Sequence, residues 1–341
     1  MSRSTVRPVL LLLGALSCTG ASGRSEIPDM RAVEPPLLLH EIELPHPISS
    51  ENDAMGFAIA TAIGFLGGRL AVVETGNDRI VLFDRDYRPV TYIGREGAGP
   101  GELRDPADIA TWRSELAVTE VNNGRVSVFD SSGMYRRSFS IPNGFSTVGY
   151  GPDGTIYVNA YDGRNYLLAA NRDGTLRPFG ERPWDLYPSE ALTAPASQIS
   201  GYIRFAVAAT GTVFVYDPVI GALVGLDPTG RQISLRGLPA RLVDDLRRQS
   251  ALVARDFGGS GRSAPANITD LSLTDDGRLL LLFPSVGAIG LLVNVSDWSA
   301  REIRWGPGLD PKIGGFGGML RGDTLYRLSM DDLRLFRLAP E

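Results

Sequence analysis

Two stretches of the chain decide its fold: LAVVETGNDRIVLFDRD, residues 70–86, and LAVTEVNNGRVSVFDSS, residues 116–132. They align without a gap at an offset of 46 residues, from position 70 to position 116. Each contains an apolar run, a glutamate, a short turn with Asn and Gly, an arginine, and a second apolar run that ends in Phe-Asp. Two apolar runs joined by such a turn are typical of a β-hairpin. We therefore predict a fold built from repeated hairpins.

Weaker copies of the same unit follow along the chain. They occupy residues 156–174, 213–230, 279–297 and 325–338. Six units of roughly 40–50 residues predict an all-β fold, a six-bladed β-propeller. The last unit is about one strand short, and a propeller that does not close exposes edge strands. We therefore expect the apolar stretch at residues 37–44 to supply the outer strand of blade six, which gives one domain over residues 37–341.

The composition excludes several classes of protein. Hydrophobic residues make up 43% and charged residues 21% of the chain, which indicates a globular protein. One cysteine rules out an internal disulfide, and two histidines leave little for sites that need several. The net charge of −5 does not favour a nucleic-acid partner, because such surfaces need a basic field.

The N-terminus predicts export. Residues 1–18, MSRSTVRPVLLLLGALSC, have a basic start and an apolar stretch that is too short to span a membrane. The end of this segment resembles a bacterial lipobox, in which Cys18 is lipidated and becomes the new N-terminus. Residues 19–36 are small, polar and Pro-bearing, which predicts a flexible tether. We expect a protein of the periplasm or cell surface, held at the membrane only by a lipid anchor.

The stretch GREGAGPGEL, residues 94–103, adds a resemblance to a known family. Together with Pro106, Ile109 and residues 116–130 it resembles the NHL repeat, and the chain is similar to the six-bladed propeller lipoproteins of bacteria. The resemblance implies a sensor or interaction domain. The chain departs from the repeat in having Glu74 and Glu120 where aspartate is usual. No lysine follows the glycines, so we interpret them as an inter-blade loop and not a phosphate loop.

The hairpin tips are the candidate ligand-binding face. Glu74 and Arg79, like Glu120 and Arg125, are five residues apart across a turn, which brings their side chains together. Each pair is either a repeated structural ion pair or part of a binding face that rings the propeller axis. The other residues predicted at these tips are Asn159, Tyr161, Arg164, Tyr216, Asp217, Ser329 and Asp331.

Two insertions interrupt the repeat. Residues 181–198 hold Trp184 and Tyr187, and residues 239–257 predict a helix. An apolar stripe on that helix either packs on the propeller surface or covers one end of the axis, with Trp184 and Tyr187 shaping a pocket. The stripe consists of Leu242, Leu246, Val253 and Phe257.

Three functions remain open at this stage. The first is a non-catalytic propeller that binds an envelope protein, a peptide or a glycan, with no cofactor. The second is a divalent-metal lactonase or lyase that resembles gluconolactonase and holds calcium or another divalent cation. Its ligands would be Glu74, Glu120, Asn159 and Asp217. Propeller lyases that depend on histidine are disfavoured, because His40 and His46 both lie in the N-terminal strand region and the rest of the chain has no histidine. The third is a purely structural envelope protein.

Overall fold

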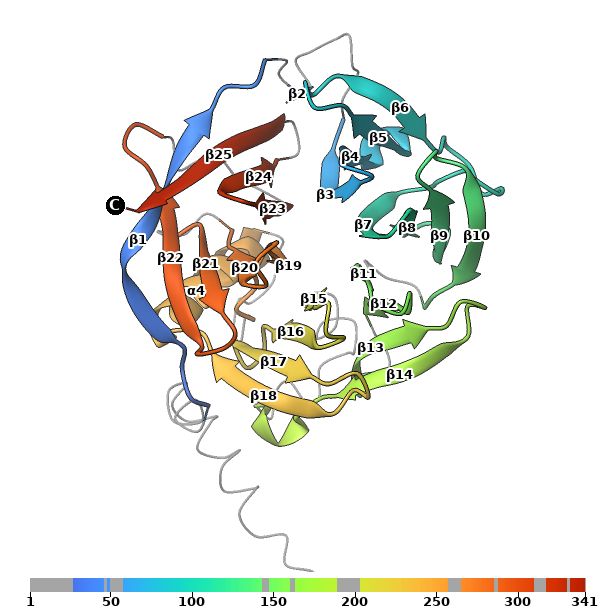
Figure 1. Ribbon diagram of the computed structural model, residues 1–341. Helices are drawn as coiled ribbons and strands as arrows, with labels where there is room; N and C mark the ends of the chain where they lie inside the picture. The colour runs from blue at the N-terminus through green and yellow to red at the C-terminus, as the bar shows by residue number, and fades with distance from the viewer. Residues whose placement is uncertain are drawn as a thin grey trace, which may run out of the picture.

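The strands stand around a common axis, as in a β-propeller (Figure 1). The computed structural model describes residues 27–45, 48–49, 58–142, 147–159, 163–188, 203–256, 265–284, 288–309, 317–329 and 332–340. The predicted export segment and Cys18 lie outside these residues. Among the described residues, no helix is long and apolar enough to cross a membrane.

Four sheets each contain four antiparallel strands in chain order. The first consists of β3 (Ala60–Leu66), β4 (Arg69–Glu74), β5 (Arg79–Phe83) and β6 (Pro89–Ile93). The second consists of β7 (Pro106–Trp112), β8 (Glu115–Glu120), β9 (Arg125–Asp130) and β10 (Tyr135–Ser140). The third consists of β11 (Val148–Tyr150), β12 (Ile156–Asn159), β13 (Asn165–Ala170) and β14 (Leu176–Glu181). The fourth consists of β15 (Arg204–Val207), β16 (Val213–Asp217), β17 (Ala222–Leu226) and β18 (Gln232–Gly237).

The remaining strands form one nine-stranded sheet instead of the two separate blades that the repeat predicts. Its main order is β19-β20-β21-β22-β1-β25-β24-β23, and β2 also pairs with β25. The bounds are β19 (Asp270–Leu273), β20 (Leu279–Leu282), β21 (Gly290–Asn294), β22 (Ser299–Trp305), β1 (Arg31–Ile42), β2 (Ile48–Ser49), β23 (Gly317–Arg321), β24 (Thr324–Leu328) and β25 (Asp332–Pro340). The two halves join because β1 pairs with β25 antiparallel and with β22 parallel.

Strand β1 confirms the predicted closing strand but corrects the predicted tether. The N-terminal strand pairs with the last strand of the chain, with Leu37 opposite Pro340 and Ile42 opposite Leu335. However, β1 begins at Arg31, and Ile27 and Met30 before it are buried in apolar clusters, so the tether predicted for residues 19–36 is wrong from residue 27 onward. The prolines that suggested a tether lie where the β1–β22 register shifts, between Val33 and Leu37. Proline is tolerated at such irregularities, because no ladder hydrogen bond is required there.

The core lies between neighbouring sheets. The innermost strands contact one another in a closed ring, β3 with β7, β7 with β11, β11 with β15, β15 with β19, β19 with β23 and β23 with β3. Several apolar clusters draw on two adjacent sheets. For example, Val73 and Leu82 of the first sheet pack with Val118 and Phe129 of the second. The predicted hairpin strands are therefore buried on both faces, because each sheet packs between two others.

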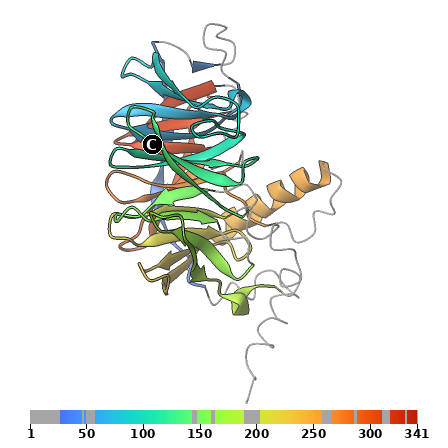
Figure 2. The same cartoon turned by 90° about the vertical axis from the view of Figure 1, so that its right-hand side faces the viewer.

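The predicted helix is present as α4 (Ala240–Asp256). Its first half packs on the fourth sheet and on β19–β21 through the buried residues Leu242, Val243 and Leu246. Leu252 is 51% exposed, and the helix extends away from one face of the disc (Figure 2). Figure 1 places α4 behind β19–β22 and not across the axis, so the predicted cover over the axis is wrong. The side chain of Val253 and all of Phe257 lie outside the described part.

Candidate functional site at the hairpin tips

Four of the predicted site residues occupy one equivalent position. Glu74, Glu120, Asn159 and Asp217 are the last residues of β4, β8, β12 and β16, the second strand of each four-stranded sheet. We call the side of the disc where these strands end the tip face. The segments that connect successive sheets also cross it. All four side chains are buried, with at most 1% exposure. The repeat therefore places chemically similar side chains at the same end of each sheet, but they are buried and not exposed on the tip face.

Glu74 and Arg79 form an ion pair within the first sheet. Glu74 Oε2 accepts a hydrogen bond from Arg79 Nε. Glu74 Oε1 accepts one from Asn77 Nδ2 at 2.6 Å and one from the backbone N–H of Ala58 at 2.7 Å. The Arg79 guanidinium lies 4.6 Å from the centre of the Tyr92 ring. Both carboxylate oxygens are therefore engaged by groups of the chain.

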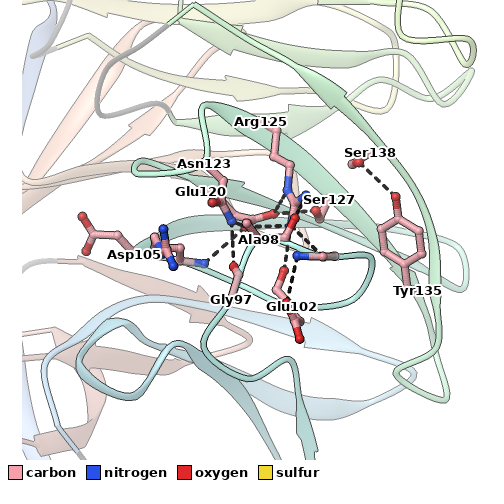
Figure 3. A network of polar contacts seen from close by, with 12 residues as sticks. Gly97, Ala98, Glu102, Asp105, Glu120, Asn123, Arg125, Ser127, Tyr135 and Ser138 are labelled. Carbon is pink, nitrogen blue, oxygen red and sulfur yellow. Dashed lines mark hydrogen bonds and ion pairs between the residues drawn. The ribbon is translucent and has the colours of Figure 1, made fainter.

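Glu120 and Arg125 repeat this arrangement in the second sheet with more partners (Figure 3). Arg125 Nε donates to Glu120 Oε1 at 2.8 Å, and Ser127 donates to the same oxygen. Glu120 Oε2 accepts from Asn123 Nδ2 at 2.5 Å and from the backbone N–H of Arg104 at 3.2 Å. The predicted structural ion pair is thus present in both sheets.

Arg125 also fixes the glycine-rich segment that precedes β7. It donates to the carbonyl oxygens of Ala98, Gly99 and Glu102 at 2.8–3.1 Å (Figure 3). Gly97 and Gly101 have φ values of 154° and 80°, which favour glycine. The segment is therefore an inter-sheet loop, as the sequence predicts, and the partly buried Arg125 side chain holds it in place.

The third and fourth sheets do not repeat the Glu–Arg pair. Asn159 Nδ2 donates to the carbonyl of Ile203 at 3.3 Å, which links the third sheet to the fourth. The backbone carbonyl of Arg164 accepts from the backbone N–H of Arg182. Tyr161 lies outside the described residues, as does Asp331. The described Ser329 donates to its neighbour Asp332 at 2.5 Å, a local turn contact.

Asp217 belongs to a buried network. Its Oδ2 accepts from the hydroxyls of Tyr166, at 2.9 Å, and Tyr187. Its Oδ1 accepts from the backbone N–H of Val219 at 3.0 Å. Burial, and then the charge of Asp217, raises the pKa of both tyrosines well above 10, so their hydroxyls stay protonated donors. Arg182 Nη1 completes the network by donating to the Tyr187 hydroxyl at 3.3 Å.

Two predicted ligand contacts belong to the core instead. Tyr216 is fully buried, and its hydroxyl donates to the carbonyl of Ala266 at 2.6 Å. Tyr187 is also fully buried and packs with Trp184, with ring centres 4.7 Å apart, and with Ile27. Tyr216 precedes the strand-end residue Asp217, so strand alternation turns its side chain into the sheet interface. The pocket predicted from Trp184 and Tyr187 is therefore replaced by packing.

The four residues proposed as metal ligands stay in separate sheets. Glu74, Glu120 and Asp217 each use both carboxylate oxygens on partners near their own strand end. In the described ranges, no group of three or more His, Cys, Asp or Glu side chains could hold a metal ion. The geometry thus offers no shared metal position to these residues.

The sequence analysis missed three charged residues on the innermost strands. Asp108 on β7, Arg204 on β15 and Asp270 on β19 each bond to the next innermost strand around the axis or to the residue just before it. Asp108 Oδ2 accepts from Val148 N–H at 2.8 Å, Arg204 Nε donates to the Thr269 carbonyl at 3.0 Å, and Asp270 Oδ2 accepts from Gly318 N–H at 2.9 Å. Burial, and then the charge of Asp270, raises the pKa of Asp108 to about 7. An alignment of the first strands would have revealed these residues, since each precedes a buried apolar residue.

Comparison with known proteins supports the fold alone. No known protein family and no curated protein matches the chain. Solved structures with the same overall arrangement include virginiamycin B lyase from Staphylococcus aureus, at 13% identity, 89% of this chain, 100% of that chain and a TM-score of 0.54. A putative exported protein from Bacteroides fragilis matches at 12% identity, 92% of this chain, 99% of that chain and a TM-score of 0.58. A streptogramin B lyase matches at 11% identity, 89% of this chain, 98% of that chain and a TM-score of 0.54. The chain is therefore similar to these proteins in its propeller fold.

Proposed function

We propose that this chain is an exported six-bladed propeller that binds a peptide, glycan or protein of the bacterial cell envelope on its tip face, without catalysis. The observation that carries the proposal is the engagement of Glu74, Glu120 and Asp217. Each carboxylate is buried and bonded to arginine, tyrosine or backbone groups of the chain. These are the groups that a metal-dependent propeller enzyme would turn toward its ligand.

The ring of innermost strands supports the blade count. Six strands, β3, β7, β11, β15, β19 and β23, contact one another around the axis. In this interpretation β19–β22 form blade five, and β23, β24, β25 and β1 form blade six. The nine-stranded sheet is then two blades joined by the extra parallel pairing of β1 with β22. Blade six reaches four strands only because the N-terminal strand β1 joins β23, β24 and β25.

The envelope location rests on the N-terminal sequence. Residues 1–18 have the pattern of an export signal that ends at Cys18, the only cysteine in the chain. One protein of similar fold is described as a putative exported protein, which agrees with this location. Loops on a rigid scaffold are common binding surfaces. The tip face presents such loops, including residues 94–105 between β6 and β7.

A second candidate is a divalent-metal lyase or lactonase. The likeness to virginiamycin B lyase and streptogramin B lyase favours it. Propeller lyases of this kind are expected to rely on histidine, which argues against this function. The exposed His40 lies on β1, opposite Arg337, and not at a hairpin tip. His46 is outside the described residues. The binding function is therefore the better supported of the two.

Site-specific photo-cross-linking tests the binding face. A photoreactive amino acid is placed at Arg104, an exposed residue of the tip-face loop, or at Met134, which is 62% exposed in a turn at the opposite face. The two full-length proteins are expressed in the native envelope and irradiated. We expect a discrete cross-linked product from position 104 and none from position 134. Equal products from both positions, or products from position 134 alone, would contradict the proposed face.

A further inference from the structure

One buried cation, Arg327, has no anionic partner in the part of the chain that the structure describes. Arg327, on β24, is 2% exposed, and its Nε and Nη1 make no hydrogen bond. Its guanidinium lies 5.6 Å from the centre of the Trp305 ring. Buried arginines are almost always paired, because an unpaired charge is costly to remove from water. Arg182 is equally buried but donates to the Asn165 carbonyl at 3.1 Å and to Tyr187.

The surroundings of Arg327 are apolar. Alternation along β24 puts Arg327 on the same side of the strand as Leu325, which packs with Leu282, Ile303 and Trp305. Burial alone lowers the pKa of Arg327 to about 10, and no neighbouring charge contributes. The side chain therefore carries a full positive charge at neutral pH, between the β19–β22 half and the β23–β25 half of the sheet. It precedes Leu328, the last residue of β24, and so lies beside the tip face.

We propose that Arg327 binds the carboxylate of a small organic acid with an apolar body. The proposal extends the proposed function, because it names a ligand chemistry for the same face. A guanidinium presents parallel N–H donors that match a carboxylate in two hydrogen bonds. A single negative charge neutralises Arg327, whereas a phosphate dianion would leave one charge in apolar surroundings. The indole of Trp305 and the aliphatic neighbours suit an apolar body.

Thermal melting and tryptophan fluorescence test this proposal. The full chain with Cys18→Ser is titrated with benzoate, and with acetate, phosphate and chloride at matched ionic strength. We expect benzoate to raise the Tm by about 5 °C at a hundredfold excess over its Kd and to change the tryptophan emission. Acetate acts more weakly, since it lacks the apolar body, and phosphate has no more effect than chloride.

Variants assign the response to Arg327. Arg327→Met abolishes the benzoate response and melts no lower than the parent in anion-free buffer, because it replaces an unpaired buried charge with an apolar chain. Arg327→Lys keeps the charge without the planar fork and responds weakly. Arg321→Met, a matched change at an exposed position of β23, keeps the full response.

Three results would overturn the proposal. The first is a missing benzoate shift, or one that persists in Arg327→Met. The second is a phosphate response larger than that of benzoate. The third is a marked loss of stability of Arg327→Met in anion-free buffer, which would mean that the chain itself supplies the anion. A benzoate response without the cross-link from position 104 would remove the proposed macromolecular partner and keep this site, and the converse would do the reverse.

Discussion

The substitution Glu120→Ala tests whether the repeated Glu–Arg pairs stabilise the propeller. It removes an acceptor that serves Arg125, Asn123, Ser127 and the backbone N–H of Arg104. Loss of one partner from a buried ion pair costs roughly 3–5 kcal/mol. Arg125 keeps its three carbonyl acceptors, so we expect the lower end, about 3 kcal/mol. For a chain of this length this corresponds to a fall in Tm of roughly 6 °C.

The assay is differential scanning calorimetry of the full chain with Cys18→Ser. Glu120→Gln keeps the shape and one acceptor oxygen, so it should fall between the parent and Glu120→Ala. The matched control is Arg95→Ala, which removes an ion pair to Glu102 whose arginine is 81% exposed. Such surface pairs contribute about 0–1 kcal/mol, so the control should melt within about 2 °C of the parent. A Glu120→Ala protein as stable as Arg95→Ala would refute the structural role and favour a ligand contact.

Three further changes probe closure, the axis and the buried network. Leu39→Ala, at a fully buried position of β1, should cost roughly 2–5 kcal/mol by urea unfolding, and His40→Ala, at the adjacent exposed position, less than about 0.5 kcal/mol. Equal costs would contradict closure by β1. The folded-state pKa of Asp108 is raised from 3.8 to about 7, so its effect is to lower stability as pH rises between these values, with no further change above 7. Asp108→Asn should therefore flatten the decline in Tm between pH 5 and 7, and an unchanged slope would refute this. Tyr187→Phe leaves Asp217 one donor short and should cost about 1–3 kcal/mol by the same urea assay, whereas a neutral effect would mean that the hydroxyl is not needed.

Local patterns predicted the hairpins because their determinants are close in sequence. The apolar alternation and the Asn/Gly turns fix the register of β4 with β5 and of β8 with β9, where Glu74 is opposite Arg79 and Glu120 opposite Arg125. The pairing of β1 with β25 followed from the need to cover an edge. These predictions used only neighbouring residues or one topological rule.

The errors arose where distant parts of the chain decide the structure. Residues 31–36 contain two prolines and suggested a tether, but residues 31–33 pair with β22, almost 270 residues later, and the prolines lie at the register shift that follows. The sequence placed Tyr216 at a hairpin tip, but β16 continues to Asp217. Tyr216 therefore lies within the strand, and its side chain is buried in the core. The partners of Asp108 and Arg204 and the surroundings of Arg327 depend on which strand lies beside each of them, which the local sequence does not show.

The metal response of the protein tests the central claim, that this propeller binds its partner without a catalytic metal. The full chain with Cys18→Ser is analysed for bound metals by mass spectrometry and melted with EDTA, calcium or zinc. The account predicts no stoichiometric metal and a Tm that none of these additions changes. A calcium-dependent rise in Tm, with a bound ion that is lost in Glu74→Gln and Asp217→Asn, would contradict it and would identify the chain as a metal-dependent propeller.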